Sequence, residues 1–342
     1  MPETYATSAE CRPLYDLMAT IKTLAPWSWM QETDILGVQN PETEENGFVS
    51  VMGRGGEHYA IAVYRGAQGL YSFHGLQQQP PALVAEILLQ IPQFQASFEN
   101  REQLEKPDRD MIKELGLKYR GQNAWPLFRS FHPGYYPWLL EPGEARFLRY
   151  ILEQLLDVAP RFKTQPALLR PKGKNRYFVR VAQQGDPLAW HDTVQEVLPP
   201  PPTNLQIAID TQLLTAVRQL PKARLTLEAD LSMMPSLIRE RGERPYFPFM
   251  LIIVESQSGM ILAGDLLHPN PSLETMWSEL PLKFLQLFAG LRAIPAEIRV
   301  RSPLLQQLIQ TIQPELGFKL KQSNRLPALD SAQNEMTQFF RR

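Results

Sequence analysis

Three carboxylates in the C-terminal half of the chain, Asp230, Asp265 and Glu335, are the residues with the most informative potential chemistry. Clustered carboxylates can hold two Mg²⁺ or Mn²⁺ ions about 4 Å apart, which activates an attacking oxygen and stabilises a leaving one in phosphoryl transfer. Asp230 ends a predicted strand, Asp265 lies within another, and Glu335 lies in the last predicted helix. The alternative is three unrelated acids: one at a strand end, one bonded to backbone donors, and one solvated on a helix.

A glycine-rich segment at residues 53–58 is the best candidate site in the N-terminal half. Glycines let backbone amides approach an anion, as in phosphate-binding loops. The segment lacks the Gly-Lys-Ser/Thr ending of such loops and opens no predicted helix. A hairpin turn is therefore the simpler interpretation. The alternative is a binding site in which Glu57 and His58 form a polar contact set with Arg54.

Residues 125–138 are dense in aromatic rings and prolines and hold four candidate binding residues, Trp125, Tyr135, Tyr136 and Trp138. The proline and glycine content predicts an ordered loop packed by its own rings rather than a regular element. Rings with a polar edge are enriched at interfaces, so these rings could line a groove for a small molecule or a peptide. The alternative is a proline-rich aromatic core. Trp27 and Trp29 belong to the same set.

Other reactive residue types give weaker signals. The five histidines show no metal-ligand spacing, and we predict no metal site from them. Cys11 is the one cysteine, which excludes an internal disulfide and fits a reducing cytoplasm, where we expect the protein to reside. The basic run at residues 172–176, followed by two aromatics, could touch a nucleic-acid backbone. A solvated loop leading into a strand is the simpler interpretation.

The length, composition and charge of the chain exclude several classes of protein. A chain of 342 residues favours two or three domains, and a hydrophobic content of 44% is that of a folded protein. A formal net charge of −1 argues against a protein whose main role is to grip polyanions. No apolar run approaches the ~18 residues of a membrane span. We expect a protein or small-molecule partner rather than nucleic acid, and no membrane.

The elements of the N-terminal half follow from periodicity. Helical spacing of apolar residues predicts helices at residues 14–24, 81–91, 99–115 and 144–158. Strands are expected at residues 35–38, 48–53, 59–64 and 176–182, the middle two joined as an antiparallel hairpin. Four consecutive prolines at positions 199–202 predict an extended spacer over residues 198–203. The expected domains are residues 1–197, with a sub-boundary near 120–140, and residues 204–342.

The C-terminal half predicts an alternation of strands and helices. Period-2 patterning marks a strand at residues 223–230, and continuous apolar residues mark a buried strand at 249–254. Further strands are expected at 260–267, 297–300 and 318–320. Helices are expected at 272–289, kinked at Pro281, and at 304–316 and 328–340. Residues 207–220 fit either a strand or a helix.

This order resembles the RNase H-like fold, in its transposase and integrase branch, through phrases such as LTLEADLSMMP and YFPFMLIIVESQSGMILAGDLLHP. The resemblance implies an Asp on the first strand, an Asp after the fourth, and a Glu on a later helix. Asp230 and Glu335 fall on the first and third of these positions. Arg301 and Ser302 occupy the second, and neither is a carboxylate ligand for a hard cation.

The opening phrases LAPWSWM, DILGVQNPET and FVSVMGRGGEHYAIAVYRG also resemble a family of uncharacterised bacterial proteins with two domains of unknown function. That family carries no activity that can be transferred to this chain.

Together these patterns predict an α/β protein with an α+β N-terminal domain and an RNase H-like C-terminal domain that has lost its acid triad. The expected function is a non-catalytic binding or accessory role without a cofactor. Two alternatives stay open. One is metal-dependent phosphoryl transfer on nucleic acid, for which Mg²⁺ or Mn²⁺ would be required. The other is small-molecule or peptide binding at an aromatic groove.

Overall fold

The computed structural model describes residues 5–76, 87–183, 185, 188–201, 205, 207, 209–234, 236–240 and 243–340. The chain divides into two compact units, which are described separately. The N-terminal unit comprises Met1–Pro201 and Glu240–Arg244, and the C-terminal unit comprises Pro202–Arg239 and Pro245–Arg342. The first division falls inside the predicted proline spacer.

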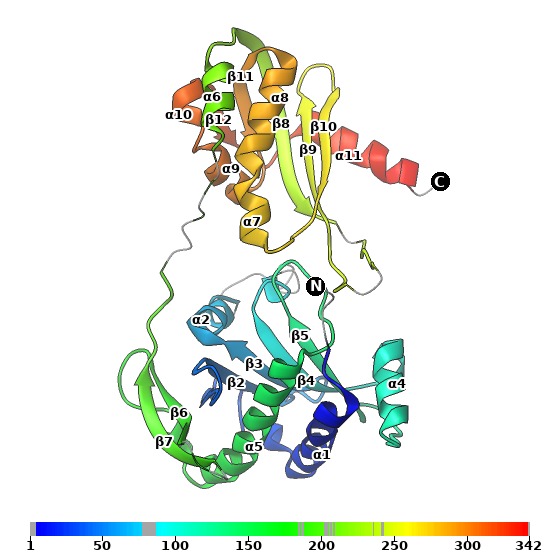
Figure 1. Ribbon diagram of the computed structural model, residues 1–342, viewed down its shortest axis with the longest axis vertical. Helices are drawn as coiled ribbons and strands as arrows, with labels where there is room; N and C mark the ends of the chain where they lie inside the picture. Colours follow the sequence, from blue (N-terminus) through cyan, green and yellow to red (C-terminus); the bar gives the residue numbers. More distant parts are fainter. Residues whose placement is uncertain are drawn as a thin grey trace. The chain divides into compact units, whose positions relative to one another are not determined.

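In the described part of the N-terminal unit, seven strands form one sheet in the order β5-β4-β3-β2-β1-β6-β7 (Figure 1). The neighbouring strands are antiparallel except for β1 and β6, which are parallel. The predicted hairpin is confirmed, because β2 and β3 pair antiparallel around residues 53–58. The strands are β1 Leu36–Gln39, β2 Asn46–Met52, β3 Tyr59–Arg65, β4 Gln93–Glu99, β5 Trp125–Phe131, β6 Arg176–Gln183 and β7 Ala189–Glu196.

Helices cover both faces of this sheet. The long helices α1 Ser8–Leu24 and α5 Pro142–Thr164 bury their apolar sides in the main core, against residues of β1 to β5. Helix α2 Gly66–Leu76 packs Leu70 and Phe73 on the other face, against Phe48 of β2 and Tyr64 of β3. Helix α4 Lys106–Glu114 and the short 3-10 turns η1 Pro26–Ser28, η2 Arg101–Gln103 and η3 Pro166–Leu169 complete the described elements.

Two predictions for this unit were wrong or incomplete, and β4 and α2 were not predicted. The predicted helix at residues 99–115 starts too early: Glu99 is the last residue of β4, η2 follows, and the α-helix in this range is α4, which begins after a capping box at Glu105. The predicted loop at 125–138 begins with β5, where Pro126 is tolerated because β5 is an edge strand. Strand β7 was not predicted. Most of the predicted helix at 81–91 lies outside the described residues.

The C-terminal unit is built on a five-stranded sheet in the order β10-β9-β8-β11-β12. The first three strands pair antiparallel, whereas β8, β11 and β12 run parallel to one another. All five were predicted near their observed positions. Their bounds are β8 Lys222–Met233, β9 Phe249–Glu255, β10 Ile261–Leu267, β11 Ile294–Val300 and β12 Lys319–Gln322.

The helices of this unit lie on two faces of the sheet. The larger core joins α6 to α10 with one face, and α11 Pro327–Phe340 packs Leu329 against Ile252 and Val254 on the other (Figure 1). The predicted helix at 272–289 is divided near Pro281, which sits in the first turn of α8, where a proline needs no backbone donor. The remaining helices are α6 Thr211–Arg218, α7 Leu273–Ser278, α8 Leu280–Leu291, α9 Pro303–Ile309 and α10 Gln313–Leu316.

The α/β prediction is confirmed, since each unit has a mixed sheet flanked by helices. None of the helices in the described ranges combines the length and the apolar character that a membrane span requires.

Candidate functional site

Asp230 lies inside β8 on the face of the sheet that α11 covers. It is opposite Ile252 of β9, which packs against α11, and its side chain is buried, with a residue exposure of only 5%. One carboxylate oxygen accepts a hydrogen bond from the backbone N–H of Leu231 at 2.9 Å. A carboxylate at this depth needs a cation or further donors, because burial disfavours its charged form.

Arg301 supplies that cation from the end of β11. Its Nη1 donates to Oδ2 of Asp230 at 3.0 Å, and its Nη2 donates to Asp330 in the first turn of α11. Arg301 therefore joins three elements, β8, β11 and α11, through one guanidinium. The position where the RNase H-like resemblance implied a second acid holds the positive partner of the first.

Glu228 lies two residues before Asp230 on the same strand face, and both of its carboxylate oxygens accept hydrogen bonds. Its exposure is 1%, and its carboxylate accepts from the hydroxyl of Ser256 and from the backbone N–H of Leu329, both at 3.1 Å. The second bond satisfies an amide in the first turn of α11, which has no partner within the helix. This buried acid thus fixes the start of α11.

The pKa values follow from these surroundings. Burial raises the pKa of Asp230, and the charge and hydrogen bonds of Arg301 offset only part of that rise. Burial lowers the pKa of Arg301, but its hydrogen bond to Asp330 and the charges of both carboxylates leave its pKa above the ordinary value. The guanidinium therefore remains charged, and Asp230 depends on it.

The other two predicted acids do not join Asp230. Asp265 of β10 pairs with Leu251, whose side chain belongs to the opposite, α8-covered face, and it contacts Lys283 of α8 at 3.1 Å. Successive side chains of a strand alternate between faces, so Asp265 and Asp230 point to opposite sides of the sheet. Glu335 is exposed on α11.

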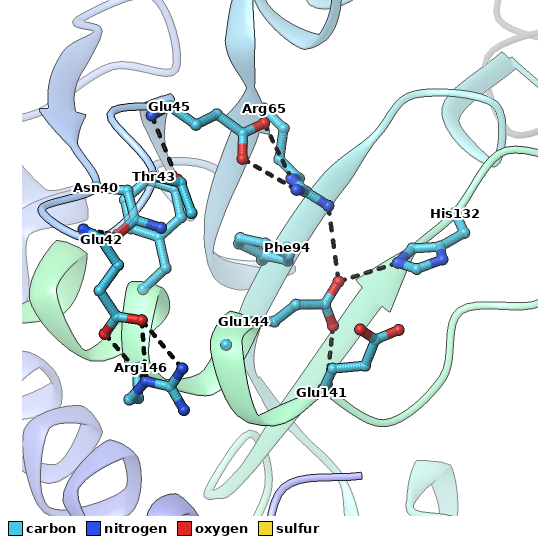
Figure 2. A pocket seen from close by; sticks show the side chains of 12 residues that line it. Asn40, Glu42, Thr43, Glu45, Arg65, Phe94, His132, Glu141, Glu144 and Arg146 are labelled. Atoms are coloured by element: carbon cyan, nitrogen blue, oxygen red, sulfur yellow. Dashed lines mark hydrogen bonds and ion pairs between the residues drawn. The ribbon is translucent and has the colours of Figure 1, made fainter. Parts of the chain in front are cut away.

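A second site, which sequence reasoning missed, lies at the start of α5. It is a cavity of about 290 Å³ lined by the loop between β1 and β2, by Arg65 and Phe94, by His132, and by the first turn of α5. Figure 2 shows Glu144 between Arg65 and His132, with Glu141 beside them. Glu141 is the residue before α5, and the two glutamates form the capping box of that helix.

Glu144 is the centre of this cavity's hydrogen bonding. One oxygen accepts from the Ser130 hydroxyl at 2.8 Å, lies 3.0 Å from Nε2 of His132, and is 3.7 Å from Nη1 of Arg65. The other accepts from the Glu141 N–H at 2.9 Å. Burial would raise the pKa of Glu144, but the hydrogen bonds from His132, Glu141 and Ser130 outweigh it and hold its pKa below the ordinary value.

His132, Glu141 and Glu144 place one potential ligand atom each within 4.8 Å of one another, and among the described residues no other such group of three occurs. Both oxygens of Glu144 already accept hydrogen bonds, which compete with metal coordination. Its charge is balanced by Arg65, which is itself held by Glu45 at 3.0 Å. The arrangement gives both oxygens of Glu144 hydrogen-bond donors, and it anchors the start of α5.

The predicted contact set at residues 53–58 is not assembled among the described residues. Arg54 and Glu57 are exposed, and in the part of the chain that the structure describes they form no hydrogen bond or ion pair with each other or with His58. His58 instead lies 2.9 Å from the Gln95 amide and 3.7 Å from Glu99, both on β4. Gly53, with φ of 131°, supplies the backbone conformation that the turn requires.

The predicted aromatic residues fall into two groups at opposite ends of β5. Trp125 is next to Tyr119, with ring centroids 5.8 Å apart. Tyr136 is next to Trp138, at 6.2 Å, and Trp138 is buried and pairs with Ser130 through a backbone bridge. Tyr135 follows the turn after the C-terminal end of β5 and donates its backbone N–H to the carbonyl of His132. One groove lined by all four residues is therefore not formed.

The thiol of Cys11 is buried in α1, and burial raises its pKa to about 11, so it stays protonated near neutral pH. This removes the nucleophilic form of the cysteine from consideration.

Comparison with known proteins assigns domains but no activity. Residues 12–180 match a domain of unknown function, DUF7309, and residues 213–337 match a second domain of unknown function, DUF6930. Searches of curated proteins and of solved structures each found no match. Two domains of unknown function therefore cover most of the chain, which is consistent with a two-domain family.

Proposed function

We propose that this protein has a non-catalytic binding or accessory role, and that its C-terminal unit is an RNase H-like domain whose acid site is closed by Arg301. The strand order supports the RNase H-like assignment: three antiparallel strands are extended beyond β8 by two strands parallel to it. A cytoplasmic location is part of the proposal and rests on the single, buried cysteine.

The observation that carries the proposal is the ion pair of Asp230 and Arg301. Two-metal phosphoryl transfer requires several carboxylates converging on two divalent cations. Here the guanidinium of Arg301 lies 3.0 Å from Asp230, where it repels a cation and satisfies the acid. Asp265 lies on the other face of the sheet, so it cannot replace the missing carboxylate.

Calorimetric titration of the full-length protein with Mg²⁺ and with Mn²⁺ tests this proposal. We expect the wild-type protein and Asp230→Ala to give the same heats, because no ion is held at Asp230. Asp265→Asn serves as the control, since it removes an acid of the same sheet from the opposite face. Saturable Mn²⁺ binding that is lost in Asp230→Ala and kept in Asp265→Asn would support the enzyme alternative and overturn the proposal.

A further inference from the structure

Two adjoining cavities on the N-terminal unit combine aromatic rings with exposed cations. The first, of about 700 Å³, is lined by Tyr119 and Trp125 together with Arg101 and Arg120. The second, of about 460 Å³, is lined by Trp27, Tyr59 and Phe98 together with Lys22. Gln122 lines both cavities, so they meet at this side chain. We refer to the two together as the Gln122 groove.

Each cavity contains a pair of tilted rings. The centroids of Tyr119 and Trp125 are 5.8 Å apart, and those of Trp27 and Tyr59 are 4.9 Å apart. All four rings are half-buried and pack against the main core of the unit. A ring fixed on one side by the core and open on the other is a platform on which a planar group can stack.

The net charge of the residues that line the Gln122 groove is positive. Lys22, Arg101 and Arg120 are exposed, and among the described residues none of them forms an ion pair with a carboxylate. Glu102 is the one acid among the described lining residues. The cavity of Figure 2 differs in this respect, because its arginines are each matched by a glutamate. The Gln122 groove therefore complements an anionic ligand.

The backbone around Gln122 is held by specific contacts. Gly121 and Asn123, on either side of it, both have positive φ values, of 96° and 48°. The Asn123 N–H donates to Oδ1 of Asn100 at 2.9 Å, and its carbonyl accepts from Lys22 at 3.1 Å. These bonds join the turn to α1 and to the end of β4, so the residue between the two cavities has a defined position.

We propose that the Gln122 groove binds single-stranded nucleic acid. Bases stack on the ring pairs of the two cavities, and backbone phosphates contact Lys22, Arg101 and Arg120. Stacking rings with cations alongside are the general means by which proteins hold single strands without reading sequence. Two adjoining ring pairs suit successive nucleotides of one strand better than one free nucleotide. The inference goes beyond the proposed function, because it concerns the other unit, and it replaces the expectation of a protein or small-molecule partner.

Fluorescence anisotropy with labelled 20-nucleotide dT and rU strands tests the inference on the full-length protein. We expect saturable binding at 50 mM salt, weakened at least about fivefold by Trp125→Ala and by Trp27→Ala. Arg120→Glu should weaken binding and reduce the dependence of affinity on salt concentration, because one phosphate contact is lost. Circular dichroism melting checks folding, and Trp125→Phe keeps a stacking ring if the alanine variant does not fold.

Two controls come from the same unit. Trp190→Ala removes a half-buried tryptophan of β7, and Arg176→Glu reverses an exposed charge in the other basic segment. Neither variant should change the affinity for the labelled dT and rU strands by more than about twofold. The inference is overturned if no saturable binding occurs at 50 mM salt, or if Arg176→Glu abolishes binding while Trp125→Ala leaves it intact. Equal affinity for a mononucleotide, or for an acidic peptide of matched charge, would also overturn it.

Discussion

Arg301 donates to Asp230 at 3.0 Å from the strand next to it, and the same guanidinium reaches Asp330 on α11. A buried carboxylate in a mixed sheet is thereby satisfied by a side chain rather than by an ion. Removing one member of such a pair leaves the other charge buried without its partner, which costs more than the pair contributes when intact.

Arg301→Ala should lower the free energy of unfolding of the C-terminal unit by about 2–3 kcal/mol, because Asp230 loses its cation and the start of α11 loses a link to β11. Native-state hydrogen exchange of the β9 amides measures this loss. Arg218→Ala is the matched control: its ion pair with Glu315 is exposed on both sides, at 62% and 51%, so less than about 1 kcal/mol should be lost. Equal losses in the two variants would contradict the assigned role of Arg301.

The cost of removing Arg301 should also depend on pH. Burial already places the pKa of Asp230 above its ordinary value, and losing Arg301 removes the largest factor that lowers it. A carboxylate whose folded pKa is raised favours folding when protonated, and this stability is lost as pH rises through the folded pKa. The destabilisation by Arg301→Gln should therefore be smaller at pH 5 than at pH 7. Hydrogen exchange at both values measures it, and an equal or larger loss at pH 5 would contradict the account.

The contribution of Glu144 to stability should depend on pH in the opposite direction. Its pKa is held below the ordinary value, so its contribution is present above the unfolded pKa of 4.5 and is lost as pH falls through the folded pKa. Glu144→Gln should cost about 1.5–3 kcal/mol at pH 7 and less at pH 3.5, because the wild-type protein then loses the same contribution. Urea unfolding followed by tryptophan fluorescence suits this unit, which holds every tryptophan except Trp277.

Glu153→Gln provides the comparison for Glu144. Glu153 lies on the same helix in a half-exposed pair with Arg149 at 3.9 Å, so its removal should cost less than about 0.5 kcal/mol at either pH. A flat pH response of Glu144→Gln relative to the wild-type protein would contradict the hydrogen bonding described for Glu144.

The turn between β2 and β3 contains two glycines that differ in the space available for a side chain. At Gly53 a Cβ atom would lie 2.6 Å from the ring of Tyr59 and 3.2 Å from Trp27, and φ is 131°. At Gly55 nothing lies within 4 Å of such an atom. Gly53→Ala should therefore destabilise the unit by at least about 1 kcal/mol, and Gly55→Ala by less than about 0.5 kcal/mol. Urea unfolding of both variants measures the difference, and similar values would refute the close approach of the ring to Gly53.

Elements with one clear hydrophobic periodicity could be predicted from the sequence, whereas elements without one were missed. The continuous apolar run at β9 and the alternation in β8 predicted strands that the structure contains. At β4 the alternation of Phe94, Ala96 and Phe98 was not recognised as a strand, and the helix that follows, α4, was predicted to start at Glu99 instead of Lys106. Helix α2 was not predicted, because glycines at positions 66, 69 and 75 dilute its periodicity.

The candidate sites could likewise be predicted from the sequence only in part. Arg301 could be located from its place after a predicted strand, but its contacts with Asp230 and Asp330 depend on three elements that are 71 and 29 residues apart in the chain. The cavity at Glu144 draws on loops and strands spread from Asn40 to Phe147. Its one local signal was the capping box of Glu141 and Glu144, which indicates a helix start rather than a site.

Paramagnetic broadening by Mn²⁺ tests the central claim most directly, namely that Arg301 takes the place of a metal at Asp230. In a methyl-labelled sample of the full-length protein, the methyl groups of Leu231 and Val300 report on the surroundings of Asp230 and Arg301. We predict that millimolar Mn²⁺ leaves these signals no broader than those of Leu316, in α10 of the same unit. Saturable broadening at Leu231 and Val300 that disappears in Asp230→Ala would contradict the claim.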